Sequence, residues 1–159
     1  MENHVATKIT GFIQKIEELI VAFILVAILA FSMLQIILRN FFDSGIIWGE
    51  SLLRILVLWL ALGGAVLASH QNKQINIDVL SRHIAEKYQH IVHGLSNLFT
   101  AVICFIIAWY SLLFVIDEYQ VNSYAFENVP AWITESIIPV AFLLMSIRYL
   151  LKLFFREAR

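Results

Sequence analysis

Apolar residues gather in four long stretches of this chain, separated by short polar segments. The stretches cover residues 19–38, 46–69, 95–116 and 132–151. Each is long enough to cross about 30 Å of hydrocarbon as a helix that rises about 1.5 Å per residue. The pattern predicts an all-α membrane protein, with four transmembrane helices in a single membrane domain over residues 1–159. Pro139 lies inside the fourth stretch and is expected to kink that helix or widen one of its turns.

Two further segments carry apolar residues at helical spacing. They are residues 1–17, with Val5, Ile9 and Ile16 on one face, and residues 76–92. Such segments are expected to lie in the membrane interface as two amphipathic helices, on the cytoplasmic side. Two interpretations stay open, because these helices could simply satisfy the interface or could brace a larger partner at the bilayer surface.

The composition agrees with a membrane protein. Of the 159 residues, 60% are hydrophobic and 14% are charged, whereas soluble domains have about 45–50% and 25%. The net charge of −1 gives no reason to expect nucleic acid as a partner. A single cysteine, Cys104, excludes an intrachain disulfide and argues against a membrane thiol oxidoreductase. The first apolar stretch is too long for a signal peptide and is preceded by Glu17 and Glu18, so it is expected to be retained.

Basic residues indicate the orientation. Nine of the eleven Lys and Arg residues lie before the first stretch, between the second and third, or from the last turn of the fourth stretch onward. The loop over residues 117–131 has no Lys or Arg and holds three acidic residues. Because basic loops stay in the cytoplasm, both termini and the second loop are expected there.

Two charged or polar pairs lie near the opposite face. Gln35 and Arg39 are four residues apart, as are Glu50 and Arg54, so each pair shares a helix face. A short loop, residues 40–45, places Glu50 at the depth of Arg39, and Glu50 is therefore expected between the two guanidinium groups. One positive charge then remains, to be offset by a partner carboxylate, a lipid phosphate, or movement of Arg39 into the headgroups. Helix packing or subunit contact is the favoured role, since no second buried acid supports a proton relay.

Small residues line one side of the second stretch, where they would let another helix approach closely. They are Ala61, Gly64, Ala65 and Ala68. The pattern leaves open whether that helix belongs to this chain or to a partner.

Histidines are absent from the middle of every apolar stretch, so haem ligation between the helices is not expected. His83, Glu86, His90 and His93 share a rough helical face, but surface histidines on an interfacial helix are the favoured interpretation over a metal site.

The stretch from residue 32 to residue 78 resembles the small membrane subunit of tripartite ATP-independent periplasmic (TRAP) transporters, the DctQ-type small permease. By topology the resemblance covers nearly the whole chain. The residues that carry it are Gln35, Ile36, Ile37, Leu38, Arg39, Asn40, Phe41, Phe42, Trp48, Glu50, Arg54, Trp59, Gly63, Gly64, Ala65, Ile75, Asn76, Ile77 and Asp78. The chain departs from the family pattern at Ser51, where a second acid is frequent, and at Gln74, where a histidine is common.

The resemblance implies a division of labour in the bacterial inner membrane. A soluble periplasmic protein captures an organic acid, such as a C4-dicarboxylate or a sialic acid, and a large membrane subunit translocates it with sodium. The small subunit would form a heterodimer with the large one, support it, and receive the substrate-binding protein on the periplasmic face. No cofactor, metal or nucleic acid is expected, while a phospholipid is one candidate occupant of the subunit interface.

The expected interface, or intramembrane polar cluster, combines these observations. Its members are Gln35, Arg39, Glu50, Arg54, Trp59, Ala61, Gly64, Ala65 and Ala68. The alternative is a self-sufficient small transporter acting as a homodimer, which would need an embedded acid accessible from both sides; Glu50 lies off-centre and beside Arg54. An enzyme is disfavoured because the chain offers no nucleophile–base pair.

Overall fold

A computed structural model of the chain describes residues 2–70 and 86–156. Its elements are α1 (Glu2–Phe41), α2 (Gly49–His70), α4 (Glu86–Val121), β1 (Tyr124–Phe126), β2 (Val129–Pro130), α5 (Ala131–Glu135) and α6 (Ile137–Arg156). Within these residues, four helical stretches are long and apolar enough to cross a membrane: Ile13–Phe41, Gly49–Ser69, Gly94–Val121 and Ala131–Leu153. The four predicted spans are confirmed, although the second helix begins at Gly49 rather than at residue 46.

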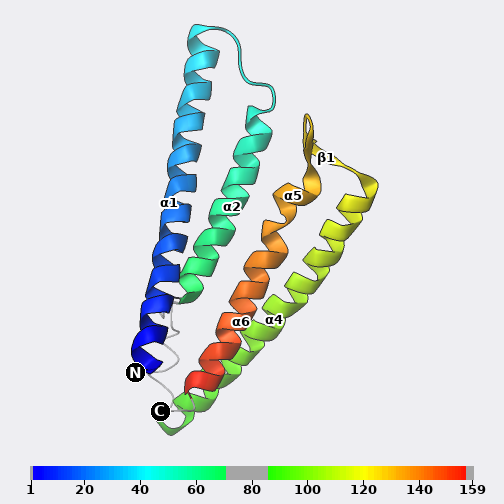
Figure 1. Cartoon of the computed structure of the whole chain (residues 1–159). Helices are drawn as coiled ribbons and strands as arrows, with labels where there is room; N and C mark the ends of the chain where they lie inside the picture. The colour runs from blue at the N-terminus through cyan, green and yellow to red at the C-terminus, as the bar shows by residue number, and fades with distance from the viewer. Residues whose placement is uncertain (1, 71–85, 157–159) are drawn as a thin grey trace.

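The helices stand side by side in the order α1, α2, α6, α4 (Figure 1). Contacts join α1 to α2, α2 to α6, and α6 to α4. The start of α1 and the end of α6 lie at one end of the molecule, and the β1–β2 hairpin lies at the other. A row of helices covers fewer of its own apolar side chains than a closed bundle, and many large hydrophobic residues on α1 and α4 are exposed.

Small buried residues bring α4 and α6 together. Ala101 and Ala108 of α4 are 2% and 5% exposed, and Ala141 of α6 is 2% exposed. Ser146 of α6 is buried too, and its hydroxyl donates to the carbonyl of Ala101 at 3.0 Å. Small side chains let helix backbones approach within a membrane, and a hydroxyl can then bond across the gap.

The fourth span is interrupted near its β-hairpin end. Helix α5 ends at Glu135, and α6 begins at Ile137. Pro139 has no N–H, and its ring collides with the carbonyl four residues earlier, which is that of Glu135. The break therefore occurs where the proline prevents a helical hydrogen bond, and the predicted kink is confirmed.

The expected interfacial helices are not seen as separate elements. Residues 2–17 are the first part of α1, which runs unbroken for 40 residues. Residues 13–41 contain neither glycine nor proline, so nothing in the sequence interrupts the helix where the expected boundary lay. Of the second segment, residues 76–85 lie outside the described residues, and residues 86–92 form the first turns of α4.

Three helices meet through polar side chains at the end opposite the hairpin. Arg148 of α6 donates from Nη1 to the carbonyl of Val66 in α2 at 2.6 Å, and its Nη2 bonds to the carboxylate of Glu17 in α1. Lys152 donates from Nζ to the carbonyl of Ser69 at 2.6 Å. We call these five residues the clasp.

The two cations of the clasp lie at the C-terminal end of helix α2. Partial negative charge accumulates at the C-terminal end of a helix, so cations there are favourable. The carbonyl of Val66 also accepts from the hydroxyl of Ser69 at 2.6 Å, and Arg148 is a second donor to it. The side chains of Arg148 and Glu17 are only 16% and 20% exposed, so the charge of each is balanced by the other.

We predict that Arg148→Gln lowers the free energy of unfolding by about 1.5–3 kcal/mol, the usual contribution of a hydrogen bond to a charged group. The substitution leaves the carboxylate of Glu17 partly buried without its cation. Unfolding by sodium dodecyl sulfate in mixed micelles, followed by circular dichroism, measures the change.

Arg39→Gln serves as the matched control, because Arg39 is exposed, and it should change the unfolding free energy little. The double variant Glu17→Gln/Arg148→Gln should lose less than the sum of the two single variants. Strict additivity, or an equal loss in the Arg39 control, would show that the clasp does not couple the helices.

Candidate functional site

Helix α2 stands between α1 and α6, yet it exposes one narrow face along its whole length. The exposed positions recur every three or four residues, which places them on one side of the helix. They are Glu50, Arg54, Val57, Ala61, Ala65 and Ala68. We call this set the α2 face; the other positions from 51 to 69 are buried or half-buried.

The small residues expected to contact a helix lie on or beside the α2 face. Ala61, Ala65 and Ala68 are exposed, and a Cβ added at Gly64 would have no atom within 4 Å. The small-residue side is therefore not used by another described helix of this chain. Among the described residues no helix of this chain covers these positions, and contact with a partner helix stays a prediction.

A different pair of glycines admits α1. A Cβ at Gly49 would lie 2.8 Å from Nε2 of Gln35, and one at Gly63 would lie 3.1 Å from Cγ2 of Val21. Gln35 also donates to the carbonyl of Ile46 at 3.4 Å. Gln35 is thus a packing residue between α1 and the start of α2, and it does not belong to the exposed surface.

Glu50 and Arg54 form a loose pair at the hairpin end of the α2 face. Oε2 of Glu50 lies 3.9 Å from Nη2 of Arg54, and the two side chains are 65% and 82% exposed. That separation is too long for a hydrogen bond, so the guanidinium keeps its donors available. Arg39 is exposed on α1 and makes no such pair with Glu50. Of the two arginines expected beside Glu50, only Arg54 is paired with it among the described residues.

Trp59 faces inward. Its Nε1 donates to the carbonyl of Thr134 at 2.9 Å, which ties α2 to α5. Thr134 is itself buried, and its hydroxyl donates to the carbonyl of Ala131 at 2.8 Å. Trp59 and Gln35, two members of the expected interface, therefore make contacts within the chain.

Aromatic rings connect the elements at the hairpin end. Trp48 stacks on Phe31 of α1, with ring centroids 6.0 Å apart, and on Phe126 of β1 at 5.9 Å. Tyr119 of α4 meets Trp132 of α5 edge to face at 5.6 Å. We call this the aromatic end. Such rings suit a membrane boundary because they are apolar bodies with a polar edge.

The clasp is the feature that sequence reasoning missed. In the sequence pattern, Arg148 and Lys152 serve only to predict the orientation of the chain in the membrane. Their spacing of four residues within an apolar helix, together with an acid at the start of the first span, is the signal that could have revealed a polar contact between helices.

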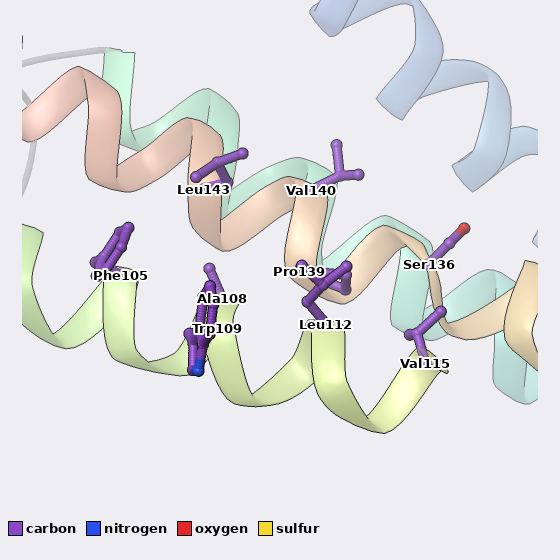
Figure 2. Close-up of a pocket in the computed structure, with 9 residues that line it drawn as sticks. All are labelled: Phe105, Ala108, Trp109, Leu112, Val115, Ser136, Pro139, Val140 and Leu143. Atoms are coloured by element: carbon purple, nitrogen blue, oxygen red, sulfur yellow. The ribbon is translucent and has the colours of Figure 1, made fainter. Parts of the chain in front are cut away.

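An apolar groove of about 250 Å³ opens between α4 and α6 (Figure 2). Trp109 and Leu112 line it from α4, and Pro139 and Leu143 line it from α6. Ser136 is its polar member, and that hydroxyl donates to the carbonyl of Ile133 at 2.7 Å. The groove offers no group for chemistry and suits a surface in contact with hydrocarbon.

Comparison with known proteins identifies the architecture. Residues 28–159 match the family described as tripartite ATP-independent periplasmic transporters, DctQ component. Two proteins of Haemophilus influenzae strain Rd, each named as a TRAP transporter small permease, are 32% identical over 96 residues and 25% identical over 142 residues. The first match covers 60% of this chain and 60% of that relative, and the second covers 89% and 83%.

A third relative is much longer than this chain. The sialic acid TRAP transporter permease protein SiaT of Haemophilus influenzae strain 86-028NP is 25% identical over 143 residues, which is 87% of this chain and 22% of that protein. The family match covers most of this chain, including about half of the first membrane-spanning stretch of the described residues and the whole of the other three. The chain therefore belongs to the DctQ family, as the small permease component of a TRAP transporter, a multi-pass membrane protein of transport and not an enzyme.

Proposed function

We propose that this chain is the non-catalytic small subunit of a sodium-coupled TRAP transporter for organic acids, of the C4-dicarboxylate or sialic acid class. It scaffolds a larger translocating membrane subunit, with which it forms a heterodimer. The observation that carries the proposal is the α2 face, which stays exposed although α2 is a central helix of the row.

Contact with lipid alone would be energetically unfavourable for the α2 face. A charged side chain that faces hydrocarbon is costly, and Arg54 is 82% exposed within a membrane-spanning helix. The alanines at 61, 65 and 68 present little side chain to lipid, but they let a second helix approach until the backbones are close. A protein partner accounts for both ends of this face.

The longer relative supports a larger partner. In the sialic acid permease SiaT, the part similar to this chain makes up 22% of the protein. There, a small-permease-like region and a much larger region share one polypeptide. This similarity supports a larger translocating region as the partner of the present one, and the name of that relative supports an acidic sugar as one substrate class.

The spans favour a scaffold over a translocation path. Transporter cores bind substrate where helices are interrupted near the bilayer midplane. Here α1, α2 and α4 are continuous, and the break at Ser136 lies five residues into its span, near the aromatic end.

The orientation completes the proposal. Both termini and the clasp lie on the cytoplasmic side of a bacterial inner membrane, where the first turns of α1 and the amphipathic segment 76–92 would contact the membrane surface. The aromatic end then faces the periplasm, and its hairpin and α1–α2 loop would meet the substrate-binding protein.

We predict that Ala65→Leu weakens co-purification with the larger membrane subunit by about tenfold, because overfilling a tight helix contact costs about 1–3 kcal/mol. Affinity capture of the co-expressed larger subunit from solubilised membranes measures the loss. Ala30→Leu makes the same change on an exposed position of α1 and should leave capture unchanged; equal capture by both variants would contradict the assigned face.

We expect the chain alone in liposomes to take up no organic acid under an inward sodium gradient. Liposomes that also contain the larger subunit should take up the substrate when the binding protein is added. Uptake by this chain alone would instead support the self-sufficient homodimer.

Cysteine labelling tests the orientation. In a Cys104→Ala background, Asn128→Cys should react with a membrane-impermeant thiol reagent added to intact spheroplasts, because the hairpin would face outward. Lys15→Cys should react only after the membrane is opened. Both side chains are exposed in the structure, so the reverse pattern would invert the topology.

A further inference from the structure

The clasp holds helix α2 by backbone atoms that lie next to the exposed alanines. Its guanidinium and its ammonium each donate to a carbonyl of α2 at 2.6 Å, and these carbonyls belong to Val66 and Ser69. Val66 directly follows Ala65 in the chain, and Ser69 directly follows Ala68. Because successive residues of a helix are about 100° apart, the residues held by α6 and the exposed alanines lie on neighbouring sides of α2.

The side of α2 that the clasp holds is also its most buried side. Val66 is 7% exposed and Ser69 is 2% exposed. The side chain of Val66 belongs to the same hydrophobic core as Ala101 of α4 and Tyr149 of α6. One side of α2 is therefore anchored by packing and by hydrogen bonds, and any rotation of this helix would break those contacts.

Two attachment points restrict α2 more than one would. The bonded carbonyls are three residues apart, which corresponds to about 4.5 Å along the helix axis. A single bond would let the helix pivot about it, whereas two bonds at different heights oppose both rotation and sliding. A rotation of about 20° would shift a side chain that lies about 5 Å from the axis by about 2 Å. Close helix contacts at small residues depend on such distances.

The guanidinium of Arg148 makes a connection that its charge alone does not supply. One of its nitrogens donates to the carbonyl of Val66 in α2, and another bonds to the carboxylate of Glu17 in α1. A planar guanidinium holds its donors in a fixed fork, while a lysine ammonium is a compact charge that does not reproduce this geometry. Arginine at this position therefore joins three helices in one arrangement.

We propose that Arg148 is a positioning residue for subunit assembly, which holds α2 at the rotation that presents Ala65 and Ala68 to the larger membrane subunit. Lys152 assists it from the next turn of α6. The inference rests on the proposed function and deepens it, because polar contacts outside the α2 face then determine the affinity of that face for its partner.

Capture of the co-expressed larger subunit from solubilised membranes tests the proposal. The variant Arg148→Lys keeps a positive charge beside Glu17 but loses the fork. Capture should weaken by about fivefold, because the loss of one hydrogen bond leaves only a fraction of the chains with α2 in the competent rotation. Lys152→Met keeps a long side chain without an N–H donor and should weaken capture by a similar factor.

Ser146→Ala is the control matched for stability. It removes the hydrogen bond to the carbonyl of Ala101, which joins α6 to α4 and does not involve α2, and it should leave capture unchanged. Arg39→Lys makes the same chemical change at an exposed arginine and should also have no effect. Unfolding in sodium dodecyl sulfate establishes that each variant is folded.

Distances between spin labels provide a readout that a loss of stability alone does not change. In a Cys104→Ala background, labels are attached at Ala61→Cys of α2 and Ile106→Cys of α4, which are both exposed positions. The full chain alone in detergent should give one narrow distance distribution. Arg148→Lys and Lys152→Met should broaden or shift it, because α2 then adopts more than one rotation.

Unchanged capture by the folded Arg148→Lys and Lys152→Met variants would overturn the proposal, as would an equal loss in the Ser146→Ala control or an unchanged label distance. If Arg148→Lys does not fold, Lys152→Met decides the outcome. A wild-type chain that captures no larger subunit would contradict the proposed function, and a broadened label distance in Arg148→Lys would then still show that the clasp sets the rotation of α2.

Discussion

The contact between α2 and α6 holds the molecule together. Helices α1 and α2 form one pair, α4 and α6 form another, and the two pairs meet where α2 packs against α6. At one end of this contact, Arg148 and Lys152 donate to the carbonyls of Val66 and Ser69 near the end of α2. At the other end, Trp59 reaches the carbonyl of Thr134 just before the break in the fourth span. In hydrocarbon, burial of apolar surface contributes little to helix association, so tight packing and polar contacts of this kind determine which helices pair.

A row of helices has consequences for function. In a closed bundle, each helix turns its small or polar residues toward a shared interior, whereas here the α2 face points away from every described neighbour. An exposed arginine and three exposed alanines on a central helix are the observations behind the proposal that another molecule covers this surface. The same geometry leaves the apolar groove between α4 and α6 open on the outside of the described part of the molecule.

The charged side chains at the two ends of α2 differ in pairing and exposure. At the clasp, the positive charge of Arg148 is matched within the chain by Glu17, and both side chains are largely covered. At the aromatic end, Arg54 and Glu50 are exposed and only loosely paired, and Glu135 holds an oxygen without a donor. The ion pair of the clasp lies within this chain, although Oε2 of Glu17 is also buried without a hydrogen-bond partner, whereas the guanidinium of Arg54 keeps donors available. Paired charges at the clasp and exposed charges at the other end are consistent with the proposed role of a subunit that supports a neighbour.

Much of the architecture could be predicted from residue patterns. Four apolar stretches of sufficient length require four spanning helices, because backbone polar groups in hydrocarbon must be satisfied within each segment. Pro139 marked the break in the fourth span, because the loss of an N–H is a local property. The order of residues from Gln35 to Asp78 indicated the family, to which the comparison of residues 28–159 assigns the chain.

The site could be predicted only in part. The pattern identified Glu50, Arg54 and the small residues of α2, but it grouped with them Gln35 and Trp59, which face inward. Spacing along one helix places residues on a common side, yet it does not say which side another helix covers. The pattern also predicted an interfacial helix separate from the first span, whereas the structure has one continuous helix, because no helix-breaking residue lies between them.

The sequence by itself determined the number of spans, the position of the proline break and the family, because these depend on hydrophobicity and local backbone chemistry. Only the tertiary structure decided that Gly49 and Gly63 admit α1, that Ala61, Ala65 and Ala68 remain uncovered, and that Arg148 reaches Glu17 across 131 residues of chain. These outcomes depend on the order and rotation of the helices in the row. That arrangement is set by the packing of all the helices together, and no single segment contains the information.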